Sequence, residues 1–373
     1  MRLMLRAGLV LGLAATACGK DALTPVDFSN PAAVSANLSS VDSAFNSNVF
    51  RSFSGATAML GAAASPALRP VATLLQVTRP KLQRAGGQIV LPGILQARRL
   101  QNSLPNLSVS AAQGRIIPDS MYGRVFEWDA TLHHYTYQGG SVASLTGVRF
   151  VLYAQGLDGA VVEPVTAIGT LDIIDQSTPS KLQLQILVKG PGGTPTYIDY
   201  TASLQVNGQT SATATASGTI SNGQSTGANK TLSFDETFTV TANGASARST
   251  FALNNPAITL MLNESVAFHS PNIVINADFR IIQNSETIQT VARVTLNTVD
   301  TTADVNVTVY KDGHPVASIQ GDPRLPGTHW VDAGGQPLTA ADIEALDHLF
   351  DALEAFQNAV NNLFLPVSTF AGL

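Results

Sequence analysis

Cysteine is almost absent from this chain, because its 373 residues contain only one. A single cysteine excludes an intrachain disulfide and any cysteine-rich zinc or iron–sulfur site. Charged residues make up 13% and aromatic residues 6%, and this charged fraction is about half the ~25% of an average soluble domain. Apolar residues nevertheless reach 45%, so the composition argues against a disordered chain, a coiled coil and a nucleic-acid binder.

Catalytic and cofactor-binding motifs are also missing. The sequence contains no H-E-x-x-H, Walker loop, G-x-G-x-x-G or C-x-x-C, and its single G-x-S-x-G, at 223–227, stands between two predicted strands and not before a predicted helix. His133 and His134 are adjacent in a strand pattern, so their side chains point to opposite faces and cannot bind one metal together. We therefore expect no enzymatic activity, no catalytic residue, no cofactor and no metal site.

No apolar run reaches the roughly 20 residues that a transmembrane helix needs. Residues 1–17 instead have the composition of an export signal peptide, with Arg2 and Arg6 before an uncharged apolar run that ends in small residues. The only cysteine, Cys18, follows Ala15-Thr16-Ala17 directly. This stretch resembles the lipobox of bacterial lipoproteins, in which the cysteine is cleaved free and acylated, although Ala15 stands where leucine is usual.

The resemblance implies that acyl chains on Cys18 anchor the protein in a membrane, with residues 18–28 as a linker. Gly19 and Lys20 follow the cysteine, and the absence of aspartate directly after it resembles outer-membrane retention. We expect a lipoprotein of the outer membrane that faces the periplasm or the surface. Because Ala15-Thr16-Ala17 also fits the cleavage rule for ordinary secretion, a soluble periplasmic or secreted protein is the alternative.

Acidic residues are absent from residues 43–118, which we call the basic tract. This tract contains eight Lys or Arg, whereas residues 119–373 contain 23 acidic and 10 basic residues. The tract can dock on the acidic C-terminal segment of the same molecule or on anionic lipid headgroups. Nucleic acid is a poor third partner, because the tract has no interleaved aromatics. Its candidate surface residues are Arg69, Arg79, Lys81, Arg84, Arg98 and Arg99.

Helical periodicity appears near both ends of the chain. Residues 29–64 carry apolar residues at helical spacing. Prolines interrupt regular structure in the residues that follow. We therefore expect residues 29–118 to form a region that is first helical and then proline-rich. Residues 340–365 form a second apolar stripe with an acidic opposite side, and Thr339 and Asp342 can cap it. We expect this helix to close a β-rich domain over 119–373.

A period of two dominates from Met121 to Ile319, most clearly at 181–189, where apolar and polar residues alternate. Turn dipeptides of the type I′ kind stand at 207–208, 222–223, 243–244 and 312–313. The pattern predicts a mainly β fold. We expect a large curved antiparallel sheet or a partly open barrel, with the N- and C-terminal helices packed on its apolar face.

Two carboxylates fall in the apolar phase of predicted strands. Glu236 is in phase with Phe234 and Phe238, and Glu264 is in phase with Leu262 and Val266. Regular strands would carry both into the interior as polar anchors for a ligand in an apolar cavity. A bulge or a strand end would instead bring each to water or to a cation such as Arg248 or Arg280.

At the level of fold alone, this organisation resembles the half-barrels with helical lids that bacteria use to carry lipoproteins and other hydrophobic ligands. That resemblance implies a non-enzymatic envelope lipoprotein that binds a hydrophobic ligand or an envelope protein. The alternative is a structural or interaction lipoprotein with a fully packed core and no ligand. An envelope hydrolase is a third hypothesis, which has no positive support in the sequence.

Overall fold

The fold is built on one open β-sheet. The computed structural model describes residues 115–346 apart from 157–159, 208–209, 225–228, 301, 323–324, 326, 341 and 344–345. They form a 15-stranded sheet in the order β15-β14-β13-β12-β11-β10-β9-β8-β7-β6-β5-β4-β3-β1-β2. The elements are η3 (Asp119–Met121), β1 (Arg124–Asp129), β2 (His134–Ser141), β3 (Gly147–Tyr153), β4 (Ala167–Asp175), β5 (Leu182–Lys189), η4 (Pro191–Gly193), β6 (Thr196–Asn207), β7 (Ser211–Ser221), β8 (Thr231–Thr241), β9 (Gly244–Asn254), β10 (Ala257–His269), β11 (Asn272–Gln283), β12 (Glu286–Asn297), β13 (Ala303–Lys311), β14 (His314–Gly321) and β15 (Val331–Asp332).

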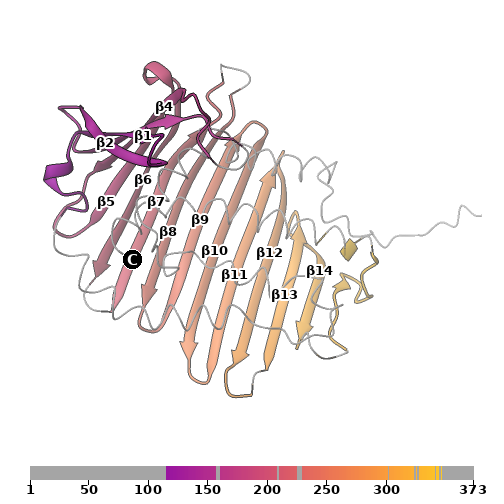
Figure 1. The fold of residues 1–373 in the computed structure, drawn as a ribbon. Coiled ribbons are helices and arrows are strands. Elements are labelled where there is room, and N and C mark those ends of the chain that lie inside the picture. The colour runs from indigo at the N-terminus through magenta and orange to yellow at the C-terminus, as the bar shows by residue number, and fades with distance from the viewer. Residues whose placement is uncertain are drawn as a thin grey trace, which may run out of the picture.

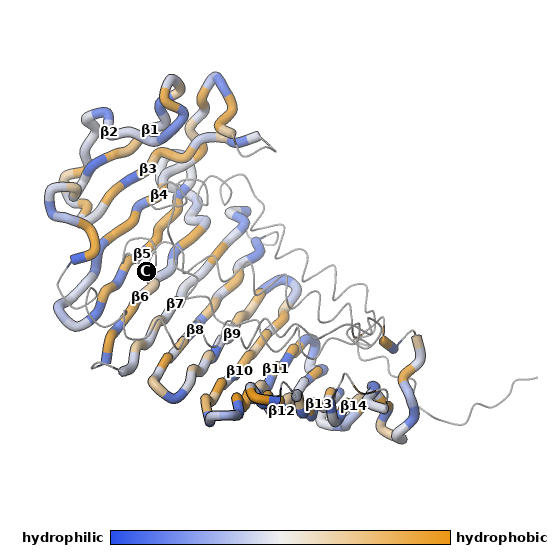
Figure 2. Tube along the Cα trace, turned by 60° about the horizontal axis from the view of Figure 1, so that its bottom comes forward, coloured by the Kyte–Doolittle hydropathy of each residue, from blue (hydrophilic) through white to orange (hydrophobic). Residues whose placement is uncertain are grey.

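From β3 to β15 the sheet is an antiparallel meander in which each strand pairs with the next along the chain (Figure 1). The order changes at the other edge, where β1 lies between β2 and β3 and pairs in parallel with β3. The sheet does not close, because β2 and β15 remain as its two edges. The predicted mainly β, antiparallel sheet is confirmed, and of the two predicted forms the open, curved sheet is the one observed (Figure 2).

The two faces of the sheet differ in the way that the alternating sequence predicts. In β5, Leu184, Ile186 and Val188 are fully buried, whereas Gln183 and Gln185 between them are only half-buried. Figure 2 shows the same alternation of hydrophobic and hydrophilic residues along successive strands. The buried side chains of all these strands belong to one continuous core cluster, so the apolar face is a single surface that runs across the sheet.

The tight turns agree only partly with the sequence pattern. Asp312 and Gly313 form a two-residue connection in which both φ angles are positive, 50° and 80°, as a type I′ turn requires. Gly244, in contrast, already lies within β9, so the prediction of a turn centred on 243–244 is wrong. A Cβ on Gly244 would collide with the backbone oxygen of Val266, which means that glycine is needed there for close strand packing.

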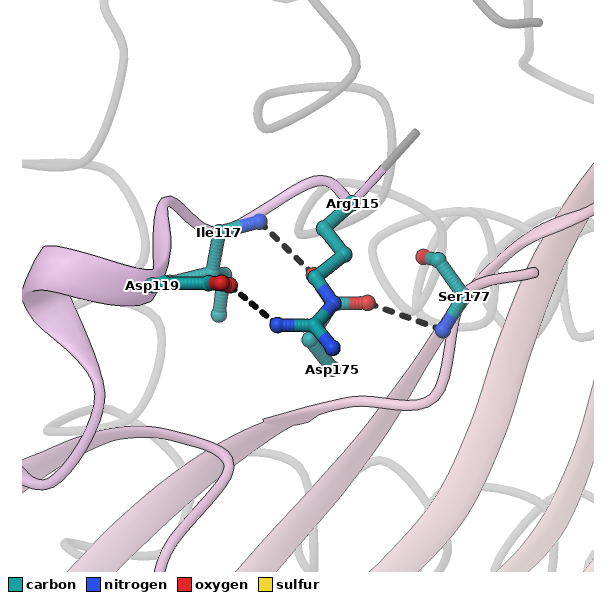
Figure 3. A network of polar contacts seen from close by, with 5 residues as sticks. All are labelled: Arg115, Ile117, Asp119, Asp175 and Ser177. Atoms are coloured by element: carbon teal, nitrogen blue, oxygen red, sulfur yellow. Dashed lines mark hydrogen bonds and ion pairs between the residues drawn. The ribbon is translucent and has the colours of Figure 1, made fainter. Parts of the chain in front are cut away.

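The segment before β1 is attached to the sheet through a buried carboxylate. Asp175, at the end of β4, accepts hydrogen bonds from the backbone N–H of Ile117 (2.8 Å) and from that of Ser177 (2.9 Å) (Figure 3). Arg115 and Asp119 form an ion pair beside it. Ile117 is only 2% exposed and belongs to the core cluster, so the chain reaches the apolar face at this point.

After β15 the chain returns to the same core. Thr339 and Asp342 make the predicted reciprocal cap, because the Thr339 hydroxyl donates to Asp342 Oδ2 (2.6 Å) and the Asp342 N–H donates to the Thr339 hydroxyl (3.2 Å). Helical residues follow at Ala340, Asp342, Ile343 and Leu346. Leu346 is fully buried in the core cluster.

The covering helices themselves are not supported by the described residues. The predicted helix over 29–64 lies outside them, and of the helix over 340–365 they include only Ala340, Asp342, Ile343 and Leu346. Within the described part of the chain, no complete α-helix is present, and no helix is long and apolar enough to cross a membrane.

Candidate functional site

Glu236 and Glu264, which we call the carboxyl pair, lie on the apolar face of the sheet. Glu236 in β8 is 5% exposed and Glu264 in β10 is 7% exposed. Both strands pair along their whole length without a bulge at these positions. The strands are therefore regular, and both carboxyl groups are in the interior, as strand regularity predicted.

Strand β9 separates the two acids and contributes only small side chains between them. Glu236 pairs with Ser249, and Glu264 pairs with Ala247, two residues away on the same face of β9. Their outer neighbours are also small, with Ala216 of β7 beside Glu236 and Ala277 of β11 beside Glu264. Strand spacing places the two glutamate backbones roughly 12 Å apart. Ala247 and Ser249 lie between them, and we call these two residues the floor.

Larger apolar residues border this floor along the strands. Phe234 and Phe238 precede and follow Glu236 on the same face of β8, and both are buried. Leu262 and Val266 hold the equivalent positions beside Glu264 in β10, and both belong to the core cluster or pack against it. The carboxyl pair is thus a polar spot within an extended apolar surface.

Neither of the cations considered from the sequence reaches the pair. Arg248 is exposed between the buried residues Ala247 and Ser249, so it points to the opposite face of β9. Arg280 is also exposed, and its guanidinium binds Asp278 at 2.7 Å. The prediction of a compensating arginine at these two positions is therefore wrong.

The environment of the pair disfavours negative charge. Glu236 Oε2 and Glu264 Oε1 are buried without a hydrogen-bond partner. Burial raises the pKa of Glu236 to about 8, although a hydrogen bond from Ser249 opposes the increase. Burial alone raises the pKa of Glu264 to about 8, so near neutral pH both groups hold a proton most of the time.

Two neutral carboxyl groups in an apolar surface can both donate and accept hydrogen bonds. They can also ionise if a cation reaches them, because an opposite charge nearby favours the charged form. The arrangement lacks an activated nucleophile, and within the described residues no group of three or more His, Cys, Asp or Glu could hold a metal ion. The pair is thus able to recognise a polar group.

The other residues predicted from the sequence lie elsewhere. Cys18 and the basic tract surface (Arg69, Arg79, Lys81, Arg84, Arg98 and Arg99) are outside the described residues. Sequence reasoning overlooked Asp175, although it follows Leu171 and Ile173 in the apolar phase of β4. It also overlooked Ser249, which stands in phase with Ala247 and Phe251 on β9.

Comparison with known proteins adds no assignment. No family model, curated protein or solved structure matches this chain.

Proposed function

We propose that this protein is an exported, lipid-anchored protein of the bacterial envelope that binds a hydrophobic ligand, without catalysis, on the apolar face of its sheet. Export and anchoring are supported by the signal-like residues 1–17 and by Cys18 directly after them. Binding is supported by the size and continuity of the apolar face. The outer membrane, on its periplasmic or outer surface, is the proposed location.

The proposal includes a cover for the apolar face made by the segments 29–118 and 340–365. A sheet with one long apolar face needs a second layer. Ile117 and Leu346 support this arrangement, because both belong to the core cluster although one precedes β1 and the other follows β15. The described ends of the two segments thus contribute to the same core cluster as the sheet.

The carboxyl pair is the observation that carries the proposal. A core that served structure alone would gain stability from apolar residues at these positions, because an unpartnered buried polar group costs roughly 1–3 kcal/mol. Two such groups stand two strands apart, with small residues between them. A ligand whose polar group completes the missing hydrogen bonds accounts for carboxyl groups at these two positions.

Native mass spectrometry tests this function on the full chain carrying Cys18→Ser, which removes the acylation site and yields a soluble protein. We expect a lipid-sized adduct to copurify and to dissociate on collisional activation. A variant with Glu236→Leu and Glu264→Leu should lose the adduct and keep its fold. Absence of any adduct, together with failure to bind hydrophobic probes, would favour the structural alternative.

The same Cys18→Ser variant tests the anchor. Cys18 is the only cysteine, so its loss should abolish incorporation of labelled fatty acid and move the protein from the membrane to the soluble fraction. A variant that stays in the membrane and still incorporates label would show that the protein is held there by another feature.

A further inference from the structure

The small residues between Glu236 and Glu264 mark a candidate binding position for a polar headgroup. The floor between Glu236 and Glu264 consists of Ala247 and Ser249, whose short side chains leave more room than the Phe, Leu and Val side chains around them. One oxygen of each glutamate is buried and without a partner. Small residues alone would not indicate a site, but here two polar side chains more than nine-tenths buried border the same floor.

A donor, an acceptor or a cation could partner these oxygens, and of the three only a cation stabilises the ionised form of a carboxyl group. At the described positions beside the pair, the facing residues are Ala216, Ala247, Ser249 and Ala277, and none of them is charged. An ammonium group has three donors and no acceptor, so it can bind oxygens of both carboxyl groups. It also supplies the positive charge that a buried carboxylate requires.

We propose that the ligand is a long-chain amphiphile with a primary amine, whose ammonium group binds between Glu236 and Glu264 above Ala247 and Ser249. The chain of the amphiphile packs along the apolar face beside Phe234 and Phe238. This inference rests on the proposed function, since it specifies the chemical class of the hydrophobic ligand. It differs from that function in requiring the two carboxyl groups to select the headgroup.

Proton release follows from this geometry. The carboxyl groups are largely protonated without ligand, and the amine arrives already charged. Binding therefore ionises at least one carboxyl group and releases its proton to the solvent. An alcohol of the same chain length can accept and donate hydrogen bonds at the site, but it cannot drive this ionisation.

Isothermal titration calorimetry of the soluble Cys18→Ser chain with dodecylamine, dodecanol and dodecanoic acid tests the inference. We expect dodecylamine to bind at least about tenfold more tightly than dodecanol, equivalent to about 1.4 kcal/mol. Titration near neutral pH in two buffers of different ionisation enthalpy should show release of protons with the amine and none with the alcohol.

Glu236→Gln and Glu264→Gln should each remove most of the preference for the amine and leave the affinity for dodecanol within about threefold. Asp235→Asn is the matched control, because Asp235 is the neighbour of Glu236 on the exposed face of β8. It likewise replaces a carboxyl group by an amide on the same strand and should change neither affinity. An equal effect of Asp235→Asn would show that the attraction is a general one between the amine and an acidic protein.

The outcomes separate this inference from the function on which it rests. If all three probes bind equally, or if the acid binds best, the amine seat is wrong and a hydrophobic carrier remains. The amine seat is also wrong if the amine binds without releasing protons. If no probe binds and no lipid copurifies, both proposals fail.

Discussion

Buried carboxyl groups at the ends of structural elements differ from those in the middle of the sheet. Asp175 and Asp342 are buried, but each accepts hydrogen bonds from backbone N–H groups or from a hydroxyl. Glu236 and Glu264 are buried to the same degree and each keeps an oxygen without a partner. Burial is therefore common to both kinds of carboxyl group, and the availability of hydrogen-bond donors separates them.

Position along the strand explains the difference. Asp175 ends β4 and Asp342 lies in the first turn of a helix, where backbone N–H groups are not used by a sheet ladder or a helix. Glu236 and Glu264 lie in the middle of β8 and β10, which are paired on both sides, so every nearby backbone N–H is engaged. Only a side chain or a ligand can supply a donor there.

The largest expected effect is on the pH dependence of stability. Because folding raises the pKa of both glutamates to about 8, the folded state binds more protons than the unfolded state between about pH 4.5 and 8. Stability is therefore greatest in acid and falls as pH rises through this range. One pKa unit corresponds to about 1.4 kcal/mol, so each group should contribute a loss of a few kcal/mol.

Urea denaturation of the ligand-free protein from pH 5 to 9 measures this loss, with the variant Glu236→Gln plus Glu264→Gln as the comparison. The variant cannot ionise at these positions and should show a much flatter profile. Equal slopes for the two proteins would mean that the carboxyl pair has partners or contact with water in solution.

The regular part of this architecture was predictable, because alternation over 181–189 and similar runs reflects one buried and one solvated face. The same period placed Glu236 and Glu264 in the interior once the strands were taken to be regular. It could not show that Arg248 and Arg280 point away, since that depends on the absence of bulges along the four adjacent strands β8 to β11.

Removal of a satisfied carboxylate should have the next largest effect. Asp175→Ala leaves the N–H groups of Ile117 and Ser177 without an acceptor, and each such group costs about 1–3 kcal/mol when buried. Because the Ser177 bond is only partly buried, we expect a total loss of about 2–4 kcal/mol by chemical denaturation. Asp175→Asn keeps one acceptor oxygen and should lose less; a loss as large as that of Asp175→Ala would point to the charge instead.

Loss of an arginine that pairs with a buried aspartate on the neighbouring strand should have an intermediate effect on stability. Arg149 in β3 donates two hydrogen bonds, of 2.6 and 2.7 Å, to Asp172 in β4, which is 5% exposed. Arg149→Met keeps the bulk of the side chain but leaves Asp172 unpaired, and we expect a loss of about 1–3 kcal/mol. Arg149→Lys keeps the charge without the two-pronged geometry, so its melting temperature should lie between those of the other two proteins.

The order of the strands beside this pair could not be predicted from local sequence. β1 precedes β2 and β3 in the chain but lies between them, parallel to β3, and periodicity contains no information about strand order. The Arg149–Asp172 pairing depends on the register of two strands 23 residues apart. Such contacts require the folded sheet, whereas the phase of Asp175 was already visible in the sequence.

The smallest effect is expected at an exposed pair. Arg280 and Asp278 lie on β11, and their side chains are 44% and 29% exposed, so solvent and salt screen their attraction. Arg280→Ala should change the free energy of unfolding by less than about 1 kcal/mol, and by less still in high salt. The hydrogen bonds from Arg280 lower the pKa of Asp278, so the variant should raise that pKa in an NMR titration while denaturation curves hardly move. A stability loss as large as that of Arg149→Met would show that a donor contributes as much beside an exposed carboxyl group as beside a buried one, which would remove the distinction between the two.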